Sequence, residues 1–147
     1  MALNKGKGFE ANFKQEFEKM GEGAKAIRIY DTENGRMGVR NICDFICYNY
    51  PKCFLLECKS HKGNRFPIQS KDKKTGEFKP FRQYEKLLEY KNVKGMVVGV
   101  VIWFYERDTI QFVSIEELEK MINDGKRSIH YKDIDEKFNE SVGIKQY

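Results

Sequence analysis

The sequence has no long hydrophobic segment and no leader-like start. Its longest apolar run, Met96–Phe104, is too short to cross a lipid bilayer. Residues 1–6 lack the apolar core that a secretory signal contains. We therefore expect a soluble, cytoplasmic protein with no membrane partner, whose cysteines are reduced.

The cysteines and histidines also lack the spacing of a zinc site. No C-x-x-C pair occurs, although structural zinc sites favour such short spacings. Two of the cysteines stand inside apolar, strand-like runs, where cysteine behaves as a small hydrophobic residue. His61 and His130 have no partner at ligand spacing. We expect no zinc at the cysteines, which are Cys43, Cys47, Cys53 and Cys58.

Basic residues outnumber acidic ones in the sequence. The 147 residues carry a net charge of +5, which is compatible with a nucleic-acid partner. Basic residues are concentrated in a polar loop expected at about 60–82. Each single lysine there could instead be an ordinary solvated side chain. The basic residues that we expect to contact DNA phosphates are Lys5, Lys7, Lys62, Arg65, Lys71, Lys73, Lys74, Lys79 and Arg82.

Hydrophobic periodicity predicts one α/β domain over residues 1–147, with a mixed sheet flanked by helices. Phe9, Phe13 and Phe17 recur at helical spacing, and Gly21 follows them. A capping box at Ser114–Glu117 opens a later helix. The chain contains no internal repeat or linker. The expected elements are helices at 9–20, 82–90 and 115–123, strands at 26–30, 42–48, 54–59, 96–104 and 109–113, a turn at 31–40, a loop at 60–80 and a polar tail at about 126–147.

Two carboxylates and a lysine form the most informative pattern. Glu57 and Lys59 lie in an apolar run that reads as a strand, where a period of two puts both side chains on one face. Charged residues are seldom buried in strands without a partner. Together with Asp44, they would suit a hard divalent cation with an ammonium group beside the reacting water or phosphate. The alternative is a charged pair on an exposed edge strand.

The order Glu10, Asp44, Glu57-x-Lys59, Gln83 resembles the PD-(D/E)XK nuclease superfamily. Within it, the chain looks most like the RecU type of Holliday junction resolvase. Residues 4–10 are similar to that family's opening helix, and Phe66-Pro67-Ile68 is similar to its Phe-Pro-Leu segment. The resemblance covers about residues 4–118 and implies a restriction-endonuclease-like core.

The sequence departs from that pattern at three places. Cys43 stands where a proline usually precedes the first carboxylate. Residues 31–40 form a short turn where family members carry a long stalk that engages the junction centre. The basic residues 70–80 look like an insertion. These departures concern the choice of DNA shape more than the nuclease chemistry.

The resemblance implies a Mg²⁺-dependent endonuclease that resolves four-way junctions of double-stranded DNA as a homodimer, in a bacterial or phage-infected cell. Mn²⁺ is expected to substitute for Mg²⁺. Asp44, Glu57, Glu10 and the main-chain carbonyl of Cys58 would hold the metal. Lys59 would orient or activate the attacking water, and Gln83 would position Lys59, the water or the phosphate.

Some alternatives stay open on the sequence alone. Glu10 could be an exposed acid in the first turn of a helix, and Gln83 an ordinary surface helix residue. The protein could be another PD-(D/E)XK nuclease, of restriction or flap-cutting type. It could also be a non-catalytic DNA-binding protein on the same fold, although that role gives no chemical reason to keep both carboxylates and the lysine.

Overall fold

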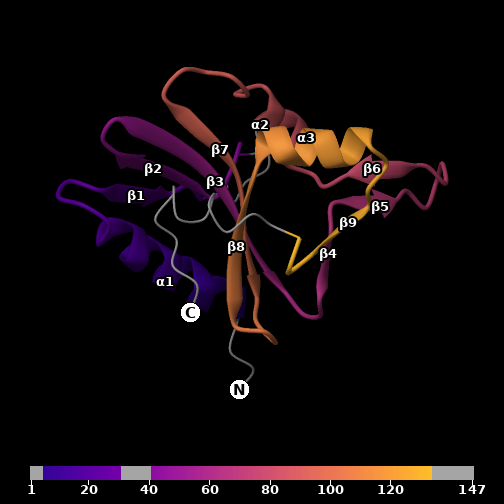
Figure 1. The fold of residues 1–147 in the computed structure, drawn as a ribbon, viewed down its shortest axis with the longest axis horizontal. Helices are drawn as coiled ribbons and strands as arrows, with labels where there is room; N and C mark the ends of the chain where they lie inside the picture. The colour runs from indigo at the N-terminus through magenta and orange to yellow at the C-terminus, as the bar shows by residue number, and fades with distance from the viewer. Residues whose placement is uncertain (1–4, 31–40, 134–147) are drawn as a thin grey trace.

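A five-stranded mixed sheet forms the centre of the molecule (Figure 1). The computed structural model describes residues 5–30 and 41–133, so the predicted turn at 31–40 and the tail beyond 133 lie outside the described residues. Strand order is β1-β2-β3-β7-β8, and only β3 and β7 pair in parallel. The strands are β1 (Lys25–Arg28), β2 (Phe45–Asn49), β3 (Lys52–His61), β7 (Met96–Phe104) and β8 (Thr109–Ser114). The predicted α/β class is confirmed.

Helices cover both faces of the sheet. On one face, α1 (Lys5–Glu18) buries the predicted row of phenylalanines, with Phe13 packed edge-on against Phe45 at 5.1 Å between ring centroids. On the other face lie α2 (Tyr84–Leu88) and α3 (Ile115–Asn123). The β3 side chains alternate between the two cores, so Leu56 faces α1 and Leu55 faces the other pair.

The capping box begins α3 as the sequence predicts. The Ser114 side chain accepts a hydrogen bond from the Glu117 backbone N–H at 3.1 Å. No helix among the described residues is long and apolar enough to span a membrane.

The loop predicted at 60–80 is wrong in part, because this region contains short strands. They are β4 (Arg65–Pro67), β5 (Gln69–Lys71) and β6 (Phe78–Pro80). A hairpin joins β5 to β6, whereas β4 pairs with β9 (Ser128–His130). Strands of three residues are too short to show alternation, and the partner of β4 is more than sixty positions away in sequence. The same pairing places a short strand, β9, in the segment predicted as a polar tail, and Ile129 of this strand is buried.

Two elements beside the candidate site begin or end a few residues away from the predicted positions. Strand β2 begins at Phe45 rather than Ile42, because its ladder with β1 ends at the Arg28–Phe45 pair. Asp44 therefore stands immediately before the strand. Helix α2 is shorter than predicted, and Gln83 is its N-terminal cap residue.

Gly99 on β7 allows β8 to approach closely. A Cβ atom built at this position would lie 2.2 Å from the Val113 carbonyl oxygen and 2.7 Å from the Phe112 ring. Both contacts are far shorter than real Cβ atoms make. The absence of a side chain at residue 99 is therefore a condition for the packing of these two central strands.

Candidate active site

Pairing between β2 and β3 brings the two predicted carboxylates together. Phe45 pairs with Leu56, so Asp44, just before β2, lies beside Glu57 of β3. One Asp44 carboxylate oxygen accepts a hydrogen bond from the Cys58 backbone N–H at 2.9 Å. The backbone of β3 thus fixes the Asp44 carboxylate next to Glu57.

Glu57 and Lys59 share one face of β3, as the strand period predicts. The Lys59 ammonium lies 2.9 Å from a Glu57 carboxylate oxygen. Glu57 is only 3% exposed, and β3 is a central strand between β2 and β7. These observations contradict the alternative of an exposed edge-strand pair.

Burial makes the negative charge of Glu57 costly. The pKa of its carboxyl is raised from the ordinary value to about 7, first by burial and then by the nearby charge of Asp44. Lys59 opposes this rise but does not cancel it. Asp44, Glu57 and Glu10 outnumber the two cations beside them, Lys59 and Arg28, and hard oxygen donors suit a divalent cation. The residues present therefore fit such a metal ion.

Arg28 is a site residue that the sequence analysis missed. Its Nε donates to Glu10 at 2.9 Å, and its Nη2 lies 3.4 Å from the other Asp44 oxygen. Burial alone would lower the pKa of Arg28, but the hydrogen bond to Glu10 and the charges of Asp44 and Glu10 raise it. The only signal for this role is the β1–β2 register, which a single sequence does not show.

Glu10 approaches the site through Arg28. It lies on α1 beyond the first turn, which contains no acidic residue, so it is not the exposed first-turn acid considered above. Among residues 5–30 and 41–133, no three His, Cys, Asp or Glu side chains converge as a metal-binding group. Direct ligation by Glu10 stays a prediction, as does the Cys58 carbonyl.

The salt bridges of Arg28 predict a measurable contribution to stability. Arg28→Ala leaves two half-buried carboxylates without their partner, and we expect it to lower the free energy of unfolding by about 2 kcal/mol. Urea unfolding followed by circular dichroism measures this loss. The matched control is Lys25→Ala on the same strand, whose exposed pair with Glu18 spans 4.0 Å and should contribute little. Equal effects of the two substitutions would contradict a structural role for the Arg28 bridge.

A pocket opens beside the two carboxylates. Gln83 and Arg82, at the start of α2, line this pocket together with Asp44 and Glu57, and their roles at the site stay predictions. Asn41 is a second missed residue, and its buried Nδ2 has no hydrogen-bond partner among the described residues. The other lining residues are Ile29, Cys43, Glu85 and Lys86.

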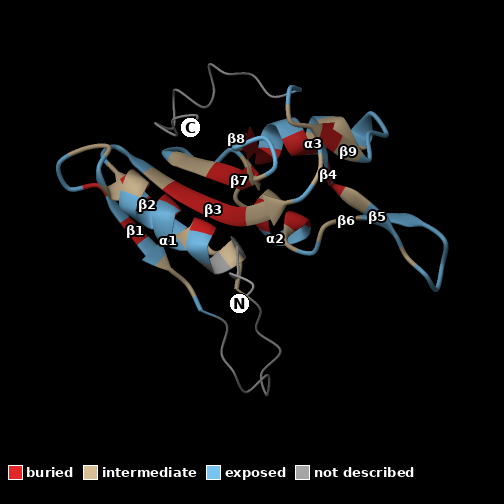
Figure 2. Cartoon of the chain, turned by 90° about the horizontal axis from the view of Figure 1, so that it is seen from below, coloured by how far each residue is buried: buried red, intermediate tan, exposed pale blue. Residues whose placement is uncertain are grey.

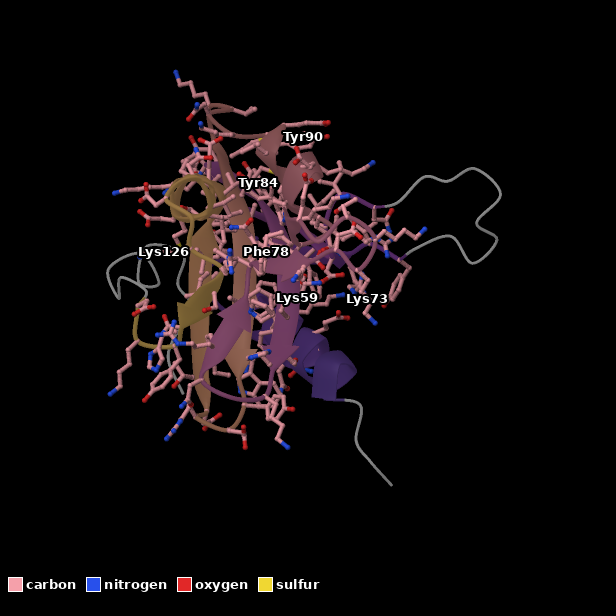
Figure 3. The ribbon with its side chains drawn as sticks, turned by 90° about the vertical axis from the view of Figure 1, so that its right-hand side faces the viewer. Lys59, Lys73, Phe78, Tyr84, Tyr90 and Lys126 are labelled. Atoms are coloured by element: carbon pink, nitrogen blue, oxygen red, sulfur yellow. The ribbon has the colours of Figure 1, made fainter. Side chains whose placement is uncertain are left out.

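The remaining predicted DNA-binding residues do not line the pocket. Lys62 follows β3, Arg65 lies on β4, and both are exposed. The hairpin of β5 and β6 carries Lys71, Lys73, Lys74 and Lys79. Figure 3 shows the molecule from the side on which this hairpin lies, and Lys59 and Lys73 are labelled there. The side chains of Lys5 and Lys7 are outside the described part of the structure.

Comparisons with known proteins identify a family and a fold. A family model described as "Archaeal holliday junction resolvase (hjc)" matches residues 1–146. Among solved structures, the chain is similar to Hjc of Archaeoglobus fulgidus, a Holliday junction resolvase from an archaeal hyperthermophile. Sequence identity is 19% and the TM-score 0.52, over 76% of this chain and 74% of that one. At that identity the likeness shows a shared restriction-endonuclease-like fold. No curated protein matches the sequence.

Proposed function

The chain belongs to the archaeal Holliday junction resolvase family, and on that premise we propose that Asp44, Glu57 and Lys59 form its hydrolytic centre. As a family member it is a nuclease that resolves Holliday junctions, acts on branched DNA and belongs to the PD-(D/E)XK superfamily. The observation that carries the assignment of these residues is a buried Glu57 held between Asp44 and the Lys59 ammonium. Within the superfamily we also propose a RecU-like subtype, and the segment Phe66-Pro67-Ile68 supports it.

The family's nucleases use a divalent metal, and we propose Mg²⁺, with Mn²⁺ able to replace it. Asp44 and Glu57 would supply its carboxylate ligands, with Glu10 and the Cys58 carbonyl as further candidates. When bound, the metal would polarise the phosphate and lower the pKa of a bound water.

The chain's own residues have separate tasks in this proposal. Lys59, held by Glu57, presents a positive charge to the attacking water or the phosphate. Gln83, which lines the same pocket, would orient the phosphate or the water. Arg82, next to it, would hold a neighbouring phosphate.

Symmetric resolution needs two active sites, so we propose a homodimer. Exposed apolar side chains on β1 and β2, such as Ile27 and Tyr48, offer surface for a second copy. Such an enzyme would act in the cytoplasm of a bacterial or phage-infected cell, where its DNA lies.

Cleavage of labelled four-way junction, flap and linear duplex with Mg²⁺ tests the function. We expect paired, symmetric nicks in the junction, and a rate about 100-fold lower for Lys59→Ala because a positioned proton-transfer or charge-stabilising group is lost. Lys94→Ala, an exposed lysine outside the site, should cut as the unmodified protein does.

Other outcomes would select the alternatives. Equal cutting of all three substrates would point to a different PD-(D/E)XK nuclease. Junction binding without metal-dependent cutting would point to a non-catalytic DNA-binding protein.

A further inference from the structure

The β5–β6 hairpin projects from the body of the molecule (Figure 2). Lys71, Lys73 and Lys74 are exposed, and none of them forms an ion pair within the described part of the chain. The hairpin contains two acidic residues, Asp72 and Glu77. Glu77 is exposed, and Asp72 is partly buried.

The turn of the hairpin is preorganised by Asp72. Its side chain accepts a hydrogen bond from the Lys74 backbone N–H at 2.8 Å, and its carbonyl accepts one from the Gly76 N–H at 2.8 Å. Gly76 has a φ of +74°, which a residue with a Cβ rarely adopts. The other Asp72 carboxylate oxygen is 2.9 Å from the Lys79 ammonium. Asp72 is therefore committed to the turn and to Lys79, and it leaves the tip lysines without an acidic partner.

The base of the hairpin is fixed to the body. A two-stranded hairpin alone is marginally stable in water, so its direction depends on outside contacts. The Ile68 N–H donates to the Arg127 carbonyl at 2.9 Å, and the Gln69 side chain donates to the Lys126 carbonyl at 2.8 Å. The Arg127 guanidinium lies 3.5 Å from the centre of the Phe78 ring. These contacts hold the hairpin in one orientation.

The hairpin leads directly into the candidate site. Strand β6 ends at Pro80, and Arg82 and Gln83 already line the pocket with Asp44 and Glu57. The ladder runs from the Gln69–Pro80 pair to the Lys71–Phe78 pair, and the hydrogen bond from the Asp72 N–H to the Glu77 carbonyl extends it by one step. The turn that carries Lys73 and Lys74 therefore begins about 10 Å from the base at the rise of a strand. Successive phosphates of one DNA strand are about 3.4 Å apart along the helix axis, so this reach corresponds to about three nucleotides beyond the base of the hairpin.

We propose that the β5–β6 hairpin is a rigid arm whose tip, Lys73 and Lys74, binds the phosphate backbone of a duplex arm beyond the nucleotides that the pocket holds. The inference rests on the proposed function and specifies how the substrate is held. The arm contacts phosphates only, so it adds affinity and orientation but no sequence preference.

Junction binding by the double variant Lys73→Ala/Lys74→Ala tests the arm, in a chelator that prevents cleavage. We expect a Kd about tenfold higher than for the unmodified protein. The slope of log Kd against log salt concentration should fall by about 1.8, because each lost phosphate contact removes about 0.9. The control Lys94→Ala/Lys120→Ala removes the same charge from positions elsewhere on the surface and should change neither value.

Position along the DNA is tested with junctions that carry uncharged methylphosphonate linkages, three at a time, stepped along each strand. One patch, separate from the linkages next to the cut, should weaken binding of the unmodified protein and have no effect on the tip variant. Equal sensitivity of both proteins at every patch, or tip and control variants with the same Kd and salt slope, would overturn the proposal. Failure of the proposed function would appear separately, as junction binding by the unmodified protein with no metal-dependent nicks.

Discussion

Replacing Glu57 by glutamine should slow junction cleavage about 1,000-fold or more while making the metal-free protein harder to unfold. Loss of a carboxylate ligand removes metal-derived stabilisation of the transition state, which amounts to several kcal/mol. The side chain keeps its size, so the strand and its neighbours need not repack. Single-turnover cleavage with Mg²⁺ measures the first effect.

The gain in stability follows from the raised pKa of Glu57. In the unfolded chain the carboxyl titrates near the ordinary glutamate pKa of 4.5, whereas in the folded protein its pKa is about 7. The folded state therefore disfavours the charged form, and stability is lost as pH rises from about 4.5 to about 7. Glutamine does not titrate, so Glu57→Gln should be more stable by up to about 3 kcal/mol at pH 8, with the difference vanishing near pH 4.5.

Urea unfolding in the presence of a chelator, at pH 5 and pH 8, measures this difference. Glu22→Gln, at an exposed turn, serves as the control and should change neither cleavage nor stability. A Glu57→Gln protein that cuts junctions at the normal rate would contradict the assignment of the site. One that is less stable at pH 8 would contradict the assigned cost of burying the Glu57 charge.

Gly99→Ala should destabilise the protein by at least about 3 kcal/mol, enough to unfold much of it. The new Cβ would meet the Val113 carbonyl at 2.2 Å, and a backbone atom of a central strand cannot move aside as a flexible side chain can. Overpacking of a core ordinarily costs about 1–3 kcal/mol, and a clash with backbone lies at or above that range.

Gly8→Ala is the matched control on α1. Nothing lies within 4 Å of a Cβ at Gly8, and alanine favours a helix over glycine by about 1 kcal/mol, so this variant should be more stable. Thermal unfolding compares the two variants with the unmodified protein. A Gly99→Ala protein with an unchanged melting temperature would show that β7 and β8 can separate without cost.

The sequence predicted the residues whose role depends on local pattern. Glu57 and Lys59 followed from the period of a single strand, and Asp44 from its place before them in an order that resembles the PD-(D/E)XK superfamily. Arg28 was not predictable, because its position beside Asp44 depends on the register between β1 and β2. The short strands of the 60–80 region were missed because β5 and β6 are polar and stabilised by turn contacts, while β4 needs a distant partner.

The pairing of Gln69 with Pro80 means that the chain enters and leaves the hairpin at nearly the same point. Segments whose ends lie together at the surface can be lengthened, shortened or exchanged with little effect on the rest of a fold. Here such a change would leave the strands that carry Asp44 and Glu57 in place. Selection can therefore act on the choice of DNA shape through one short insertion, while the chemistry of bond cleavage is inherited unchanged with the sheet.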